Sequence, residues 1–244
     1  MTDLGPGTPL SRRAASDAVN DLGWRYLLAT LCASVPTRSL LEASEVSTAV
    51  VAACGTDGDG HLRLDLRPDG IELSLQTRSV GKVTAGDIDL ARRASAALDD
   101  LGLRPAGATR ADLGRARPVQ MLEIAIDALD IPAIRPFWKA VLAYVAEPGD
   151  EGPEGALVDP TGQMAALWFQ QMEAPRPQRN RAHLDVTVAH DEAEARVEAA
   201  LDAGGRLVNS SFAPSFWVLA DAEGNEACVC TWTGRDEREA LQPE

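Results

Sequence analysis

The chain has 244 residues, and 45% of them are hydrophobic, which is enough for two ordinary domains with separate cores. The formal net charge is −14, and residues 118–244 carry 9 Lys and Arg against 22 Asp and Glu. An acidic half of this kind lacks the clustered cations that bind phosphate backbones, so we expect no nucleic-acid partner. The sequence shows neither an apolar stretch long enough to span a bilayer nor the basic and apolar regions of a signal peptide, which predicts a cytoplasmic protein with no membrane partner.

The first half predicts a domain at residues 11–103, preceded by a disordered N-terminus at residues 1–10. The two expected strands alternate apolar and polar side chains and are joined by the turn Pro68-Asp-Gly70. The expected elements are helices at 16–22 and 40–53, strands at 62–67 and 71–76, and a helix that begins after residue 84. The fold class of the chain is therefore α+β.

The last of these helices carries a capping signal. Thr84 suits the N-cap, and Asp87 stands at the third helical position, where a carboxylate accepts hydrogen bonds from unpaired backbone amides. The surrounding run, Gly81-Lys-Val-Thr-Ala-Gly-Asp-Ile-Asp-Leu-Ala91, resembles pterin-4a-carbinolamine dehydratase. This resemblance implies an antiparallel sheet with helices, and an active site that rests on a His-His-Pro motif and a third histidine.

The histidines of that site are largely missing from this chain. An ungapped count back from Asp87 puts the His-His-Pro motif on Gly60-His61-Leu62 and the third histidine on Arg78. Dehydration of a carbinolamine needs one proton delivered and another removed, and imidazole does both near neutral pH. Arginine stays charged and exchanges no proton. We therefore expect His61, Arg78 and Asp87 to form a degenerate pterin site, in which His61 and Arg78 have the alternative of being ordinary exposed residues.

A basic segment rich in Pro and Gly at residues 104–118 reads as a linker to a second domain at 119–233, which is followed by a tail at 234–244. The second domain holds the same plan twice. Each copy opens with an alternating strand, Met121-Leu-Glu-Ile-Ala-Ile-Asp127 or Arg181-Ala-His-Leu-Asp-Val-Thr-Val188, changes to helical spacing, and returns through hydrophobic strands.

Five segments of this domain resemble the glyoxalase-like division of the vicinal oxygen chelate superfamily. They are Phe137-Trp138, Asp159-Pro-Thr-Gly162, Leu167-Trp-Phe-Gln170, Pro175-Arg-Pro-Gln-Arg-Asn-Arg-Ala-His-Leu-Asp185 and Asp221-Ala-Glu-Gly-Asn225. The resemblance implies two βαβββ units that curl around a cleft. It also implies a divalent ion, held by His, Glu or Gln from the first and last strands of each unit, which polarises two adjacent substrate oxygens.

The four metal-ligand positions that the resemblance implies are only partly filled. They fall near Glu123, on Ala166, on His183 and on Cys228. A hard cation such as Mg²⁺ wants more oxygen ligands than this, whereas a Glu123, His183 and Cys228 set suits Zn²⁺. We expect no metal and no other cofactor. In its absence Glu123 and His183 form a catalytic acid/base pair if both face the cleft. The alternative is that Glu123 is a paired surface carboxylate and that His183 hydrogen-bonds Asp185 or the backbone within the strand.

Aromatic and polar side chains on the neighbouring strands predict the rest of the substrate site. Trp168 and Trp217 each have a ring neighbour that faces the opposite side of its strand, so one ring of each pair lines the cleft and the other packs in the core. The expected substrate-binding residues are Trp168, Gln170, Trp217 and Cys228.

Three functions remain open on the sequence. The first is a metal-independent enzyme that acts on a small ring-bearing molecule by lyase, isomerase or cyclase chemistry in the second domain, with the first domain as dimerisation surface or pocket wall. The second is a 4a-hydroxytetrahydropterin dehydratase. The third is a binder that sequesters a metabolite without turnover. In each case we expect a homo-oligomer.

Overall fold

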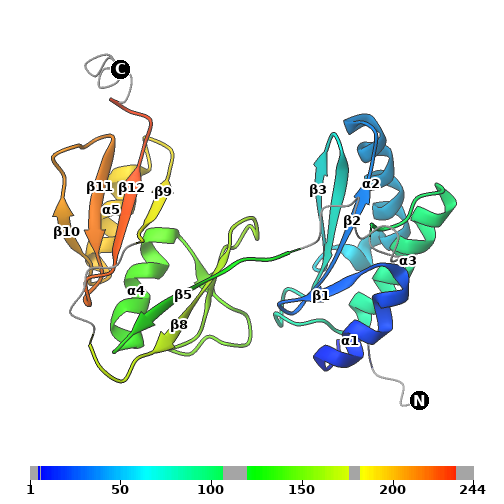
Figure 1. Cartoon of the computed structure of the whole chain (residues 1–244), viewed down its shortest axis with the longest axis horizontal. Coiled ribbons are helices and arrows are strands. Elements are labelled where there is room, and N and C mark those ends of the chain that lie inside the picture. The colour runs from blue at the N-terminus through cyan, green and yellow to red at the C-terminus, as the bar shows by residue number, and fades with distance from the viewer. Residues whose placement is uncertain (1–4, 6, 107–119, 176–181, 235–244) are drawn as a thin grey trace. The chain divides into compact units, whose positions relative to one another are not determined.

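A computed structural model describes residues 5, 7–106, 120–175 and 182–234 of the chain. The chain divides into two compact units, Met1–Met121 and Leu122–Glu244 (Figure 1). Residues 107–118 of the expected linker and 235–244 of the expected tail lie outside the described residues. Within the described part, no helix is long and apolar enough to cross a membrane.

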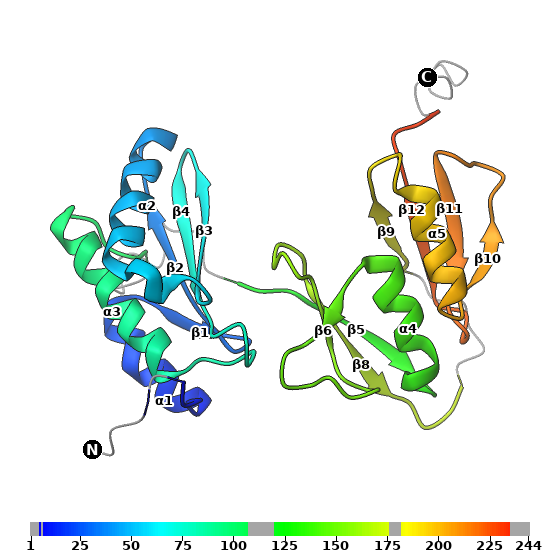
Figure 2. The ribbon, with the colours of Figure 1, turned by 180° about the vertical axis from the view of Figure 1, so that it is seen from behind.

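The first unit contains a four-stranded antiparallel sheet, ordered β1-β2-β4-β3. Three α-helices cover one face of this sheet (Figures 1 and 2). Its elements are α1 (Arg12–Val19), the 3-10 helix η1 (Asn20–Leu22), β1 (Arg25–Leu27), β2 (Thr30–Pro36), α2 (Leu40–Cys54), the 3-10 helix η2 (Gly55–Gly58), β3 (Leu62–Arg67), β4 (Gly70–Leu75) and α3 (Ala85–Asp100). The buried core between helices and sheet includes Trp24, whose Nε1 donates to Ser95 Oγ at 3.0 Å.

The sequence did not predict the hairpin that β1 and β2 form. Leu27 pairs with Thr30, so the turn consists of Leu28 and Ala29 alone, with φ of 42° and 58°. A two-residue hairpin turn favours positive φ, which normally signals Gly, Asn or Asp in the sequence. Here the turn residues are Leu and Ala, so the sequence carries no such signal.

The start of α3 confirms the capping signal. Thr84 and Asp87 form a reciprocal capping box, with Asp87 Oδ2 accepting from Thr84 N at 2.7 Å. The segment before α1 also contacts this region, because Pro9 forms a β-bridge with Thr84 and Leu10 N donates to Val83 O. The expected disorder over residues 1–10 therefore does not extend to Pro9 and Leu10.

The second unit repeats one βαβββ plan, which confirms the duplication. The first module consists of β5 (Glu123–Ala128), α4 (Ile131–Leu142), β6 (Val145–Ala146), β7 (Leu157–Val158) and β8 (Ala166–Gln171). The second module consists of β9 (Leu184–Thr187), α5 (Ala193–Asp202), β10 (Arg206–Asn209), β11 (Phe216–Ala220) and β12 (Glu226–Cys230). The sheet orders are β5-β8-β7-β6 and β10-β11-β12-β9. In each module the first and last strands pair in parallel and the remaining pairs are antiparallel. The α+β class expected from the sequence is thus confirmed.

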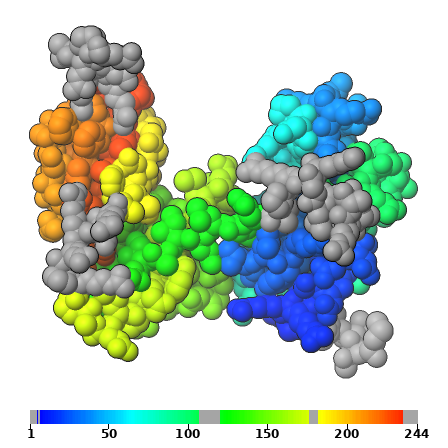
Figure 3. All heavy atoms as spheres, in the orientation of Figure 1, coloured from blue at the N-terminus to red at the C-terminus, as the bar shows by residue number. Residues whose placement is uncertain are grey.

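The two modules share one buried core. Its members come from both, among them Phe137 and Trp138 of α4, Val197 and Ala200 of α5, and Leu219 of β11. Figure 3 shows the modules as adjoining masses within this unit, green to yellow-green for the first and yellow to red for the second. The candidate site lies where the two modules meet.

Candidate functional site

The first module presents its polar side chains on the sheet face turned away from the helices. Ile124, Ile126, Leu167 and Phe169 belong to or pack on the core under α4 and α5. Because side chains alternate along a strand, the intervening residues of β5 and β8 lie on the opposite, open face. These residues are Glu123, Ala125, Asp127, Ala166, Trp168 and Gln170. Trp168 is 37% exposed, which fits an open-face position.

The open face of the second module gathers three groups with different chemistry. Asp185 of β9 stands directly beside Cys228 of β12 in the parallel pair, and His183 precedes Asp185 by two residues, on the same side. His183 Nε2 lies 3.2 Å from Asp185 Oδ1, and the nitrogen, oxygen and sulfur atoms of the three side chains all lie within 4.8 Å of one another. This short distance involves the same two residues as the sequence alternative for His183.

Burial and the neighbouring carboxylate control the protonation of Cys228. Cys228 is buried, with 7% of its surface exposed, and its thiol donates to the Asp185 carboxylate. Burial first, and then the hydrogen bond and negative charge of Asp185, raise the pKa of Cys228 to about 12. At neutral pH the group is a thiol rather than a thiolate, so it is a weak nucleophile on its own.

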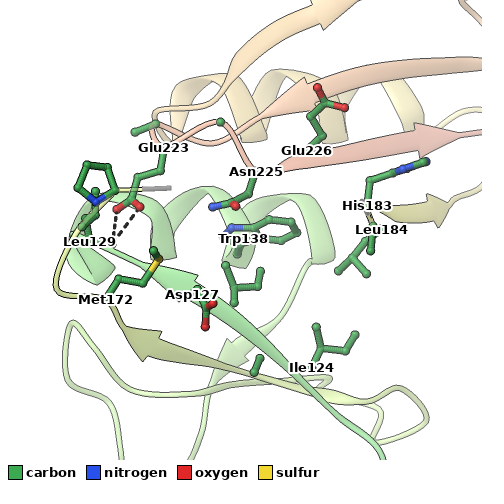
Figure 4. Close-up of a pocket in the computed structure, with 16 residues that line it drawn as sticks. Ile124, Asp127, Leu129, Trp138, Met172, His183, Leu184, Glu223, Asn225 and Glu226 are labelled. Atoms are coloured by element: carbon green, nitrogen blue, oxygen red, sulfur yellow. Dashed lines mark hydrogen bonds between the residues drawn. The ribbon is translucent and has the colours of Figure 1, made fainter. Parts of the chain in front are cut away.

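A cavity of about 690 Å³ lies at the seam between the modules (Figure 4). This volume is typical of small-molecule sites. Its apolar wall is formed by Ile124, Ile126, Leu129, Trp138, Met172 and Leu184, and its polar groups are Asp127, His183, Glu223, Asn225 and Glu226. His183 is the residue that this cavity shares with the His183, Asp185 and Cys228 cluster.

The loop after β11 fixes one end of this cavity. The buried Asp221 accepts from Trp138 Nε1 at 2.9 Å, from Asn225 Nδ2 at 2.8 Å and from the backbone amides of Glu223 and Asn225, each at 2.9 Å. Glu223 in turn accepts from Leu129 N, as the dashed lines of Figure 4 show, and from Asp130 N at 2.7 Å. These bonds join the second module's loop to the start of α4 in the first module.

The expected site residues of the second domain therefore separate into groups. His183 and Cys228 come together, as expected for one site. Glu123 belongs neither to their cluster nor to the cavity lining. Trp168 and Gln170 face the open side of the first module, outside the cavity lining.

Trp217 lies on the core side of its strand. It packs against the buried core, whereas its neighbour Phe216 lies on the open face and stacks on Phe212, with ring centroids 5.0 Å apart. Alternation along the strand predicts that Phe216 and Trp217 point to opposite sides. It does not say which of the two faces the helices; in the structure the partly buried Trp217 packs against the core.

Sequence reasoning did not assign Asp185, Asp127, Glu226 or Trp138 to the site. The His183-x-Asp185 spacing was an available signal, because alternate strand residues share a face. The contribution of Trp138 had no such signal, since its partner Asp221 is 83 positions away in the chain.

In the first unit, His61 and Asp87 form a direct pair. His61 Nδ1 lies 2.7 Å from Asp87 Oδ1, and the fully buried Asp87 also accepts from Thr77 Oγ1 at 2.8 Å and from Thr84. Arg78 is exposed and joins this region through its backbone N, which donates to Gly60 O at 3.1 Å. His61 is thus held by a carboxylate, while the Arg78 side chain projects to solvent.

The residues at the four ligand positions that the resemblance implies do not fit a hard divalent ion. These positions are Glu123, Ala166, His183 and Cys228. Ala166 offers no ligand atom, Cys228 offers sulfur in place of an oxygen, and Glu123 is not part of the cluster around His183. A hard cation such as Mg²⁺ needs near-complete oxygen coordination. No chemistry of the second unit is therefore derived from such an ion.

Comparisons with known proteins give a family match in the second unit. Residues 123–230 match the family described as "Glyoxalase-like domain". No curated protein matches this chain in sequence. A glyoxalase/bleomycin resistance protein/dioxygenase family enzyme from Burkholderia phytofirmans is 19% identical, with a TM-score of 0.37, over 45% of this chain and 95% of that one. A glyoxalase/dioxygenase from Nostoc punctiforme is 16% identical, with a TM-score of 0.37, over 48% and 97%.

The first unit also has a similar solved structure, a transcriptional coactivator/pterin dehydratase from Brucella melitensis. It is 20% identical, with a TM-score of 0.34, over 37% of this chain and 98% of that one. For the second unit, the sequence match and the fold agree: residues 123–230 match the glyoxalase-like domain family, and they fold as the two βαβββ modules that the resemblance implied.

Proposed function

We propose that the second unit is an enzyme that converts a small, ring-bearing organic molecule by acid/base chemistry of the lyase, isomerase or cyclase kind. The observation that carries this proposal is the position of His183, which lines the 690 Å³ cavity and is held by Asp185 at 3.2 Å. An imidazole held by a carboxylate at the edge of an apolar cavity is a common arrangement for proton transfer near neutral pH.

Asp185 takes the role that the sequence suggested for Glu123. With Nε2 of His183 donating to Asp185, the lone pair on Nδ1 is available to remove a proton from a bound substrate. The imidazolium that forms is stabilised by the Asp185 carboxylate, and the same proton is then returned at another atom of the substrate. This sequence gives an isomerisation, or an elimination when a leaving group accepts the proton, and it requires no metal.

The cavity walls suit a substrate with a flat apolar part. Trp138, Met172 and Leu184 supply the apolar surface, whereas Asp127 and Glu226 supply carboxylates at its edge. We propose that the ring packs on the apolar wall while its polar substituents point toward His183. A site of this composition orients its ligand through few polar groups, as small-molecule sites generally do.

The experiment compares His183→Ala with His190→Ala. His190 is the matched control, because it is a histidine of the same unit that packs edge-on against Trp232, outside the cavity lining. Mixtures of cyclic ketones, enols and β-hydroxy acids are incubated with the full chain in D₂O, and solvent deuterium incorporation or product formation is followed by NMR. We expect turnover to fall at least about 100-fold in His183→Ala and to be unchanged in His190→Ala.

Turnover that survives in His183→Ala would overturn the proposal. Saturable binding in the cavity without any turnover would instead support the third function, a protein that sequesters a metabolite. Glu123→Gln completes the set: a loss equal to that of His183→Ala would return the proton-transfer role to Glu123.

A second candidate function rests on the His61 and Asp87 pair of the first unit. The buried carboxylate orients the imidazole, so the pair retains one element of a 4a-hydroxytetrahydropterin dehydratase. Gly60 and Arg78 occupy the other two histidine positions, and each lost proton-transfer group is worth about 10²–10⁴-fold in rate. We expect dehydration of 4a-hydroxytetrahydropterin barely above the uncatalysed rate. A fast reaction that His61→Ala abolishes would establish the second function in place of this expectation.

The partner and assembly of the chain are part of the same proposal. We propose a homo-oligomer in which the first unit supplies a dimerisation surface. Light scattering of the full chain tests this assembly, and a monomer at micromolar concentration would exclude it.

A further inference from the structure

Four hydrogen bonds fill the acceptor positions of Asp221, the buried aspartate behind the cavity. Its Oδ1 accepts from the backbone amides of Glu223 and Asn225, each at 2.9 Å. Its Oδ2 accepts from Trp138 Nε1 at 2.9 Å and from Asn225 Nδ2 at 2.8 Å. A carboxylate has about four lone-pair positions, and all of them are used here. Asp221 is also fully buried and is not part of the cavity lining, so it holds neighbouring residues rather than a ligand.

The same bonds fix the orientation of the Asn225 side-chain amide, which lies beside the Trp138 ring in Figure 4. The Asp221 carboxylate accepts hydrogen bonds and offers no proton, so the amide group that faces it is the NH₂ group. The oxygen lies at the other corner of the planar amide, away from Asp221. Because Asn225 lines the cavity and Asp221 does not, this oxygen is on the cavity side.

The position of this oxygen determines what the cavity recognises. An amide oxygen only accepts hydrogen bonds, and its two lone pairs let it accept from a ligand in addition to any contact within the protein. The apolar side chains of Leu184 and Met172 belong to the same lining, so a bound ring is held mainly by burial and by few polar groups. A ligand without a donor would remove water from the amide oxygen without replacing its hydrogen bond, which weakens binding.

We propose that Asn225 is a recognition residue of the cavity, that Asp221 is its positioning residue, and that the ligand is a cyclic molecule with an O–H or N–H donor on its ring. This class comprises phenols, cyclic alcohols and enols, and heterocycles with a ring N–H. The inference rests on the proposed function, because it names the substrate class of the same cavity. It concerns binding alone, whereas the role of His183 concerns turnover, so the two proposals fail separately.

The corresponding turn of the first module provides a matched control. Its aspartate is Asp159, and Gln163 follows it by four residues, as Asn225 follows Asp221. The backbone amide of Gln163 donates to Asp159 Oδ2 at 2.9 Å, and that of Asn225 donates to Asp221 Oδ1 at the same distance. Gln163 is exposed, however, and is not part of the cavity lining. A substitution there removes a comparable amide side chain without changing the cavity.

The test measures binding of defined probes to the full-length chain and needs no known substrate. The probes are two matched pairs, indole with benzofuran and 2-naphthol with 2-methoxynaphthalene. In each pair the ring system is kept while the N–H or O–H donor is removed. Affinities come from titrations followed by the ¹H–¹⁵N NMR shifts of the protein. We expect the donor of each pair to bind about 10-fold more tightly than its partner, because the partner leaves a buried acceptor unsatisfied.

Variants assign the recognition to Asn225 and the positioning to Asp221. Asn225→Leu should bind both members of each pair equally, because the amide oxygen is gone, whereas Gln163→Leu should keep the preference of the unaltered chain. Asp221→Asn should also lose the preference, because its new NH₂ group is able to donate to the Asn225 oxygen and turn that oxygen away from the cavity. A merely structural role of Asp221 would weaken both members by the same factor and leave their ratio unchanged.

Circular dichroism establishes that each variant is folded. If Asp221→Asn does not fold, the unaltered chain and the comparison of Asn225→Leu with Gln163→Leu decide alone. Equal affinities within both pairs in the unaltered chain, no saturable binding of either donor, or a donor preference that persists in Asn225→Leu would each overturn the inference. A donor preference together with turnover that survives in His183→Ala would instead reject the proposed function and leave this inference standing.

Discussion

The two modules of the second unit share one topology but use the same turn motif differently. Both contain an aspartate that closes a turn with a glycine at positive φ, Asp159 with Gly162 and Asp221 with Gly224. Among the described residues, Asp159 accepts from its own turn alone, including Thr161 Oγ1 at 2.7 Å and the amide of Gln163 at 2.9 Å. Asp221 accepts in addition from Trp138 Nε1 of the other module. The duplicated motif is therefore local in one module and a tie between modules in the other.

The open faces of the two modules also differ, and again the second module carries the additional functional side chains. The equivalent parallel strand pairs place Glu123 beside Ala166 in the first module and Asp185 beside Cys228 in the second. Only the second pair has a ligand or proton-transfer group on both strands. The comparison shows how a duplicated fold keeps its backbone plan while concentrating reactive side chains in one copy.

The largest expected effect is a loss of unfolding free energy when the hydrogen bond between Asp221 and Trp138 is removed. Asp221→Ala leaves the buried Trp138 Nε1 without its acceptor and also frees the amides of Glu223 and Asn225. Unpaired buried donors and lost bonds to a carboxylate cost about 3 kcal/mol of unfolding free energy. Asp159→Ala should cost about 1 kcal/mol, because the amides of Thr161, Gln163 and Met164 belong to exposed residues that water is able to solvate.

Urea denaturation followed by circular dichroism measures both variants. Equal losses in Asp221→Ala and Asp159→Ala would show that the two motifs are equivalent and that the bond to Trp138 contributes little.

A second effect concerns the packing of the helices across the modules. Gly205 follows α5, and a Cβ added there would lie 2.4 Å from Phe137 Cδ2 and 2.7 Å from Ala200 O. Because one of these neighbours is backbone and the other is a buried ring, Gly205→Ala should cost about 1–3 kcal/mol. Gly152→Ala is the control, since nothing lies within 4 Å of its added Cβ. Thermal unfolding of both variants checks the difference, and unchanged stability in Gly205→Ala would mean that α4 and α5 separate easily.

Local patterns predicted the features of this molecule that depend on near neighbours. The capping box at Thr84 and Asp87, the alternating strand at β5 and the two βαβββ modules all follow from periodicity or short spacing. The hairpin at Leu28 and Ala29 was missed because its turn residues are not the usual ones.

The site was harder to predict because it depends on pairing across strands. The sequence analysis put Glu123 with His183 and Cys228 because of its position in the repeat. The register of β9 with β12 gives that place to Asp185 instead. A one-residue difference decides which face a strand residue occupies, and this is also why Trp217 rather than Phe216 was assigned to the cleft.

The smallest expected effect is a change in the pKa of Tyr144. This change distinguishes Asp159 of the first module from Asp221 of the second. Burial first, and then the negative charge of Asp159, raise the pKa of Tyr144, whose hydroxyl donates to Ala165 O at 2.8 Å. Asp159→Asn should lower the pKa of Tyr144 only part of the way, because burial remains, and Asp221→Asn should leave it unchanged. The chain has two tyrosines, so ultraviolet absorbance is followed against pH in a Tyr26→Phe background.

The sign of the accompanying stability change is fixed by the same shift. The folded state holds Tyr144 protonated more strongly than the unfolded state, so the stabilisation is complete below the unfolded pKa of about 10 and is lost as pH rises through the higher folded pKa. Above pH 10 the unaltered chain should therefore lose stability more steeply with pH than Tyr144→Phe does. Parallel pH dependences in the two proteins, or a Tyr144 titration unaffected by Asp159→Asn, would show that the Asp159 turn is electrostatically isolated as well as structurally local.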